Sequence, residues 1–157
     1  MLPAGNTVTE DMPRLSIIIA TWQAAATLEH CLKSIIDQDF KDWELLIADG
    51  ASTDGTVDLI GNYQRYIAWW QSDKDEGIYD AWNQALPHAR GDYACFLGAD
   101  DAWADSGALA RIFAAIGDQQ YDLVTSSGLF LDSTTGKSLT FGSAWDYDRI
   151  GRRTVVC

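Results

Sequence analysis

Short apolar runs recur along the chain and predict the strands of a sheet. The runs are Leu15 to Ala20, Trp43 to Ala48, Ile67 to Gln71 and Tyr93 to Leu97. Runs of this length, rich in β-branched and aromatic residues, are typical of strands that are buried on both faces. A further strand is expected over Asp122 to Leu131, followed by a turn around Thr135 and Gly136.

Segments with apolar residues at helical spacing lie between and after these runs. They fall within residues 28–36, 57–63, 78–86 and 109–116. Strands that alternate with helices predict an α/β fold with a mostly parallel sheet and helices on both faces. Residues 1–13 are expected to form a flexible N-terminal tail, and residues 14–157 a single domain.

Composition and charge exclude several classes of protein. The chain is 47% hydrophobic, which favours folding over disorder. Its net charge of −12 argues against binding of nucleic acid through the phosphates. No apolar run approaches the length of a membrane span, and no signal peptide is evident. The three cysteines, Cys31, Cys95 and Cys157, lack the spacing of a metal site or a disulfide framework, so a cytoplasmic location is expected.

Polar residues follow three of the predicted strands at the point where each strand ends. They are Thr21, Asp49 and the adjacent pair Asp100 and Asp101. Because the carboxyl ends of parallel strands lie at one edge of a sheet, these side chains should converge on a ligand site. A divalent cation would relieve the repulsion between the paired carboxylates, and Mg²⁺ or Mn²⁺ would bring a substrate phosphate with it.

Structural roles for the same acidic residues remain open at this point. Asp100 and Asp101 could belong to the N-terminus of the next helix, with Asp105 or Ser106 as its cap. Asp49 could form an Asx turn with Gly50. The loop after the first strand has no glycine, which excludes a dinucleotide-binding fingerprint.

Four segments together resemble the family 2 glycosyltransferases of the GT-A fold. They are Leu15 to Trp22 (LSIIIATW), Leu45 to Thr56 (LLIADGASTDGT), Asp75 to Asn83 (DEGIYDAWN) and Gly91 to Asp101 (GDYACFLGADD). The resemblance implies a Rossmann-like, three-layer α/β/α fold. It also implies a nucleotide-diphospho-sugar donor, most often a UDP-sugar, and a divalent metal. The reaction would be an inverting transfer to an acceptor hydroxyl, in the synthesis of a cell-surface polysaccharide or glycolipid.

The resemblance assigns the donor to nine positions: Ala20, Thr21, Trp22, Asp49, Asp75, Gly77, Asp80, Asp100 and Asp101. Asp49 would accept a hydrogen bond from a ring N–H of the base. Asp100 would hold the Mn²⁺ or Mg²⁺ ion, with Asp101 in support. Asp80 is equally well explained as a carboxylate in the first turn of a helix. Ser52, Thr53 and Asp54 are expected to cap the next helix.

The chain departs from the family pattern in three respects. Gly98 stands at the first position of the Asp-x-Asp metal motif, and Glu76 stands where relatives often carry lysine. A catalytic base is expected only beyond Cys157, which suggests a donor-binding domain truncated at its C-terminus. The alternative function is therefore a sugar-nucleotide-binding module without turnover.

The expected partners follow from the same resemblance. They are the nucleotide-sugar donor and a saccharide or lipid-linked acceptor, with peripheral association at the inner face of the cytoplasmic membrane. The seven tryptophans leave a protein-binding surface open, and a homodimer would be one outcome of such a surface.

Overall fold

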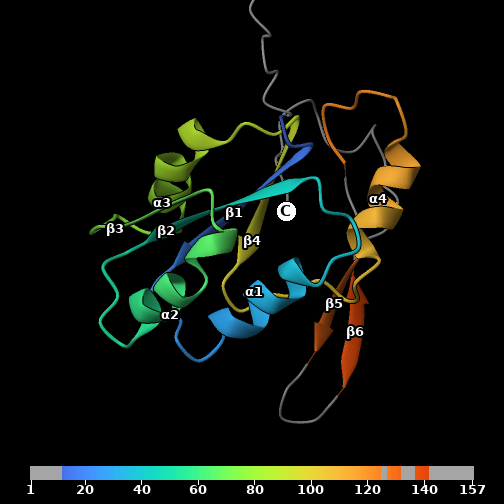
Figure 1. Ribbon diagram of the computed structural model, residues 1–157. Coiled ribbons are helices and arrows are strands. Elements are labelled where there is room, and N and C mark those ends of the chain that lie inside the picture. The colour runs from blue at the N-terminus through green and yellow to red at the C-terminus, as the bar shows by residue number, and fades with distance from the viewer. Residues whose placement is uncertain (1–11, 125–126, 132–136, 142–157) are drawn as a thin grey trace, which may run out of the picture.

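A four-stranded parallel sheet forms the centre of the computed structural model, which describes residues 12–124, 127–131 and 137–141. The strands lie in the order β3-β2-β1-β4 (Figure 1). Their bounds are β1 Leu15–Thr21, β2 Trp43–Asp49, β3 Trp69–Ser72 and β4 Tyr93–Gly98. The helices are α1 Leu28–Ile36, α2 Thr56–Asn62, α3 Ile78–Ala85 and α4 Ala108–Ile116, with short 3-10 helices η1 Gln64–Tyr66 and η2 Leu86–His88.

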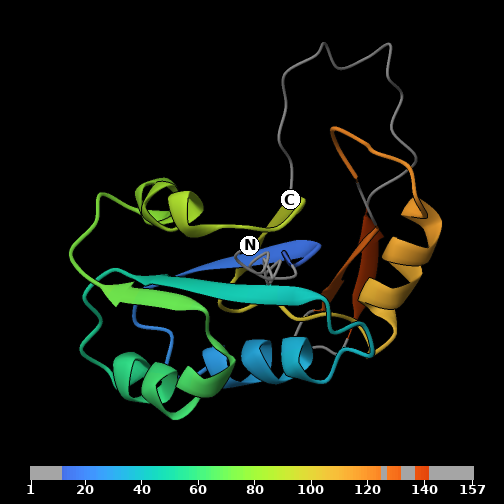
Figure 2. The same cartoon turned by 45° about the horizontal axis from the view of Figure 1, so that its top comes forward.

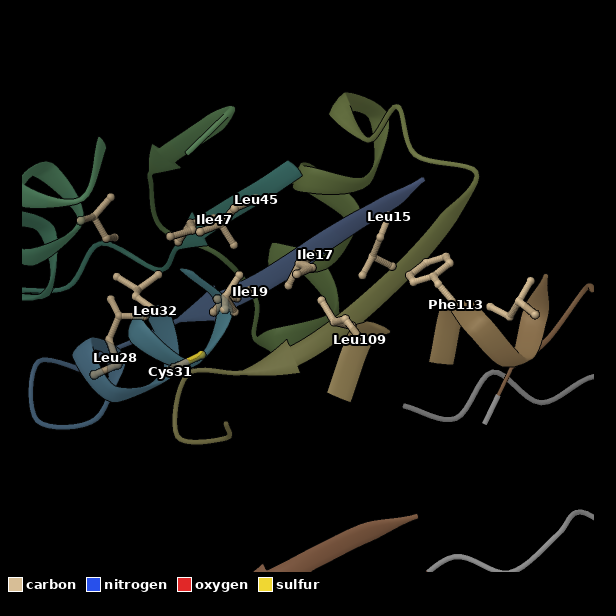
Figure 3. Close-up of a cluster of buried hydrophobic side chains, with 14 residues drawn as sticks. Leu15, Ile17, Ile19, Leu28, Cys31, Leu32, Leu45, Ile47, Leu109 and Phe113 are labelled. Atoms are coloured by element: carbon tan, nitrogen blue, oxygen red, sulfur yellow. The ribbon is translucent and has the colours of Figure 1, made fainter. Parts of the chain in front are cut away.

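Helices cover both faces of this sheet, so the three-layer arrangement is confirmed. Alternate residues of a strand point to opposite faces. Ile17 and Ile19 of β1 therefore pack against α1, α2 and α4, whereas Ile18 packs against Ala81 and Ala85 of α3. Figure 2 shows α1 and α2 on one side of the sheet and α3 on the other. Figure 3 shows the larger of the two cores.

The predicted elements differ from the observed ones at two strands. β3 begins at Trp69 rather than Ile67, because the Ile67 N–H donates to the Gln64 carbonyl and ends η1. Among the described residues of the strand expected over 122–131, only Gly128–Leu131 (β5) form a strand. It pairs antiparallel with β6 (Ser138–Phe141) in a separate two-stranded sheet.

Several expectations concern residues outside the described ones. They are most of the tail over residues 1–13, the turn around Thr135 and Gly136, and the end of the chain near Cys157. Within the described part of the chain, none of the helices combines the length and the apolar character needed to cross a membrane.

Candidate functional site

The carboxyl ends of the four central strands lie side by side at one edge of the sheet. Thr21 pairs with Asp49, Asp49 pairs with Ser72, and Ala20 pairs with Gly98 across the other side of β1. The expected convergence of the strand ends is therefore present, and the loops that leave all four strands begin at this edge.

A cleft of two adjoining hollows, about 720 and 380 Å³ in volume, follows this edge. Ala20, Trp22 and Ile78 line both hollows. The larger hollow is also lined by Thr21, Gly50, Ala51, Lys74, Asp75, Gly77 and Ala81. The smaller one is also lined by Gln23, Ala24, Thr27, Gly98, Ala99 and Asp100. Six of the nine positions assigned to the donor thus line the cleft, and Asp49, Asp80 and Asp101 do not.

Asp49 is buried beneath the cleft and is saturated by hydrogen bonds. Its Oδ1 accepts from Thr21 Oγ1 at 2.8 Å and from Ser52 Oγ at 2.6 Å. Its Oδ2 accepts from the Ser52 N–H at 2.9 Å and from Ser72 Oγ at 2.6 Å. An ionised carboxylate has about four acceptor sites, and these four donors use them. The side chain joins the ends of β1, β2 and β3.

The charge of Asp49 is set by two opposing effects. Burial, with only 1% of the residue exposed, favours the neutral acid. The hydrogen bonds from Ser52, Ser72 and Thr21 favour the carboxylate and outweigh burial, so the pKa of Asp49 lies below its usual value. Asp49 is therefore an ionised carboxylate that is stabilised by hydrogen bonds from uncharged donors.

Side-chain hydrogen bonds fix the loop after β1 against the loop after β2. Gln23 and Ala51 both have a positive φ, of 50° and 56°. Ser52 Oγ accepts from the Gln23 N–H at 2.8 Å, and the Thr53 N–H donates to Gln23 Oε1 at 2.9 Å. Asp54 Oδ2 accepts from the Ala25 N–H. These contacts hold the backbone that lines both hollows.

Ser52, Thr53 and Asp54 were expected to cap the following helix, and of the three only Asp54 bonds to it. Asp54 Oδ1 accepts from the N–H of Thr56, the first residue of α2, at 3.1 Å and from Thr56 Oγ1 at 2.6 Å. Gly55 is the N-cap of α2 and makes no side-chain cap bond. Ser52 and Thr53 bond instead to Asp49 and to Gln23 in the loop after β1.

Trp22 is the aromatic residue among the described residues that line the cleft. Trp22 is 71% exposed, and together with Ile78 it lines both hollows. An exposed indole and an exposed isoleucine at the rim provide an apolar surface on which a planar or sugar ring can pack.

Asp75 and Gly77 form the turn that leads into α3. Asp75 Oδ1 accepts from the Gly77 N–H at 2.9 Å. Gly77 has a φ of 118°, a conformation that residues with a side chain rarely adopt. Asp80, one turn further on, accepts from the Glu76 N–H and from Gln84 Nε2, each at 3.1 Å. Asp80 thus serves the first turn of α3 and does not line the cleft.

Asp100 and Asp101 lie on the turn that follows β4, where the Asp101 N–H donates to the Gly98 carbonyl. A Cβ at Gly98 would stand 2.7 Å from Asp101 Oδ2 and 2.9 Å from Asp100 Oδ1, so both carboxylates lean over this glycine. Within the described residues no donor bonds to either carboxylate. Burial first, and then the nearby charges of Asp101 and Asp100, raise the pKa of the Cys31 thiol beneath them to about 12.

This carboxylate pair fits a metal that is bound together with substrate. No group of three or more His, Cys, Asp or Glu side chains able to hold a metal occurs among the described residues. Mg²⁺ is commonly held by one or two carboxylates plus substrate phosphates, which does not require such a group. Asp100, which lines the smaller hollow, and Asp101 beside it supply that donor set.

The site contains residues that the sequence did not single out. Lys74, Gly50 and Ala51 line the larger hollow. Lys74 carries one visible signal, since it is a lone basic residue between Asp73 and Asp75 just before a helix. The pattern gives no indication that Gly50 and Ala51 shape a wall, because that role depends on the folded loop.

Comparisons with known proteins agree with this geometry. The sequence profile of Glycosyl transferase family 2 matches residues 16–137. A "PGL/p-HBAD biosynthesis glycosyltransferase" of Mycobacterium bovis is 37% identical over 150 residues, which are 92% of this chain and 57% of the relative. The chain therefore spans little more than half the length of this relative.

Two solved structures share the fold. Staphylococcus aureus TarS 1-349 in complex with UDP-GlcNAc superposes with a TM-score of 0.60 at 25% identity, over 66% of this chain and 31% of that one. The mannosyltransferase PcManGT from Pyrobaculum calidifontis, in complex with GDP-Man and Mn²⁺, gives a TM-score of 0.59 at 30% identity, over 68% and 33%. The fold is accordingly GT-A, and the chain belongs to glycosyltransferase family 2.

Proposed function

We propose that the chain binds the donor for an enzyme that transfers a sugar from a UDP-sugar to an acceptor hydroxyl. The observation that carries this proposal is the cleft at the carboxyl edge of the sheet. It has the Asp75 carboxylate in its larger hollow and the Asp100 carboxylate in its smaller one. The UDP-GlcNAc and GDP-Man complexes of the two structural neighbours support a nucleotide-sugar ligand.

Each part of the cleft suits one part of such a donor. Ala20, Thr21 and Trp22 offer backbone and an aromatic face to the nucleoside, and Asp75 and Gly77 border it from the α3 side. Asp100, with Asp101 beside it, would hold Mn²⁺ or Mg²⁺ against the diphosphate. When bound, the cation would neutralise the negative charge that builds up on the leaving nucleoside diphosphate.

Asp49 and Asp80 act on the donor through other residues. Asp49 fixes Thr21 and the loop containing Ser52, which form the floor and one wall of the cleft. Asp80 holds the backbone at Glu76, next to the Gly77 turn. Neither carboxylate needs to touch the ligand for the cleft to keep its shape.

The acceptor is a saccharide or a lipid-linked molecule of the cell surface, in line with the biosynthetic role in the name of the mycobacterial relative. An inverting displacement needs a base to deprotonate the acceptor hydroxyl. Both carboxylates that line the cleft within the described residues, Asp75 and Asp100, are assigned to the donor and not to this base.

Calorimetric titration of the chain with UDP, GDP and dTDP, with and without Mn²⁺, tests the proposal. We expect saturable binding of UDP that strengthens when Mn²⁺ is present. A folded chain that binds none of the three nucleotides under either condition would contradict the proposed function.

A second function, binding of the donor without turnover, is favoured by the lack of a carboxylate free for acceptor chemistry among the described cleft residues. An assay for the release of free sugar from a UDP-sugar distinguishes the two functions. The chain is incubated with the UDP-sugar, and free sugar is detected by chromatography. Measurable donor hydrolysis would exclude the module without turnover.

A further inference from the structure

Lys74 is the basic residue that lines the cleft in the described part of the chain. It is exposed and borders the larger hollow beside Asp75. No hydrogen bond or ion pair of its ammonium group occurs among the described residues. The other described residues that line either hollow are neutral or acidic, so Lys74 is the charged donor that a ligand would meet there.

Asp75 presents an unused acceptor at the same place. Its Oδ1 accepts from the Gly77 N–H, and no donor among the described residues bonds to its Oδ2. A Cβ on Gly50 would stand only 2.7 Å from this Oδ2. The carboxylate therefore occupies the space that a side chain at position 50 would need. By contrast, both oxygens of Asp49 already accept two hydrogen bonds each.

The strand order places Lys74 and Asp75 at the far end of the cleft from Asp100. The Asp75 carboxylate lies against Gly50, which follows β2, and the Asp100 carboxylate lies against Gly98 at the end of β4, so that β1 lies between them. Two strand spacings of about 4.8 Å separate the two carboxylates by about 10 Å. An extended nucleoside diphosphate spans such a gap, and its base then lies at the Lys74 end when its diphosphate lies at Asp100.

We propose that Lys74 and Asp75 together read the base of the donor, an inference that rests on the proposed function. Asp75 Oδ2 accepts the ring N–H, and the Lys74 ammonium donates to a carbonyl oxygen beside that N–H. Uracil offers this pattern, because its N3–H lies between two carbonyl groups. Cytosine has an acceptor at N3, which would face the carboxylate of Asp75 without a proton between them.

Titration calorimetry of the chain with UDP and CDP in Mn²⁺ tests this assignment in two variants. Lys74→Met removes the charged donor and should weaken UDP binding about tenfold, the value expected for one charge-assisted hydrogen bond. Asp75→Asn keeps an acceptor for the Gly77 N–H but adds a donor, so it should reduce the preference for UDP over CDP. Each variant has a control with the same change of charge outside the cleft. Lys33→Met on α1 is the control for Lys74→Met, and Asp73→Asn is the control for Asp75→Asn.

Thermal melting first shows that all four variants fold. Unchanged UDP affinity in Lys74→Met, or an unchanged UDP/CDP preference in Asp75→Asn, overturns the assignment while leaving the proposed function intact. Absence of nucleotide binding by the unmodified chain removes both proposals. Equal weakening of inorganic pyrophosphate binding by Lys74→Met would place the lysine at the phosphates and would also overturn the assignment.

Discussion

At the scale of one residue, the carboxylate of Asp49 joins the ends of three strands through its hydrogen bonds. The sequence predicts that Asp49 lies at the carboxyl edge of the sheet, and it does lie there. The sequence alone does not reveal that Thr21, Ser52 and Ser72 all direct hydroxyl groups at it. Short-range chemistry of this kind depends on side-chain directions that appear only after the strands have paired.

Asp49→Asn should destabilise the chain by about 1–3 kcal/mol at pH 7, because an amide cannot accept all four hydrogen bonds. The folded-state pKa of Asp49 is lowered, so its contribution is complete above the unfolded-state pKa. It is lost as the pH falls through the folded-state pKa. Urea unfolding of both proteins should therefore show a stability gap at pH 7 that narrows below about pH 4. A gap that is constant between pH 7 and pH 3 would argue against an ionised Asp49.

Asp100→Ala should remove the Mn²⁺-dependent part of UDP binding, with a loss of metal affinity of about 100-fold. Stability should change by less than about 0.5 kcal/mol, because no donor among the described residues bonds to this exposed carboxylate. Calorimetry and thermal melting measure the two effects, and Asp118→Ala beyond α4 is the control. Unfolding of Asp100→Ala would instead assign Asp100 a structural role.

At the scale of elements, Gln38 joins the end of α1 to the start of α4. Its side chain is fully buried. Nε2 donates to the Ser34 carbonyl at 3.0 Å and to the Asp105 carbonyl at 2.8 Å, and Oε1 accepts from the Leu109 N–H at 3.0 Å. Gln38 thus satisfies an N–H in the first turn of α4, whose own N-cap residue, Gly107, has no side chain to do so.

Gln38→Leu should lower the free energy of unfolding by about 1–3 kcal/mol, because it leaves the buried Leu109 N–H without its acceptor and removes one of the two donors to the Asp105 carbonyl. Chemical denaturation monitored by tryptophan fluorescence measures this loss. Gln64→Leu, at an exposed position in η1, should stay within about 0.5 kcal/mol of the parent chain. Similar stabilities for the two variants would mean that α4 is held without Gln38.

At the scale of the whole molecule, the central α/β arrangement could be predicted because each strand and helix has a clear period. The two cores follow directly from the alternation of Ile17, Ile18 and Ile19. The separate antiparallel pairing of β5 with β6 could not be predicted, since an apolar run does not determine which strand it will pair with. Strand pairing is a long-range choice, and the sequence pattern is local.

The edge that carries the cleft was also predictable, whereas its detailed chemistry was not. Parallel strands bring Thr21, Asp49 and the residues after Gly98 together by topology alone. Which carboxylates are buried in hydrogen bonds and which line the cleft depends on contacts between loops. Asp49 faces inward, where Thr21, Ser52 and Ser72 donate to it, whereas Asp75 lines the larger hollow.

The hydrogen bonds between Gln23, Ser52 and Thr53 have a consequence for how a ligand arrives. Two loops that are joined to each other by side-chain hydrogen bonds lose little conformational freedom when a ligand binds in the cleft. Nucleotide association should then proceed in one kinetic phase, with no slow rearrangement after the encounter.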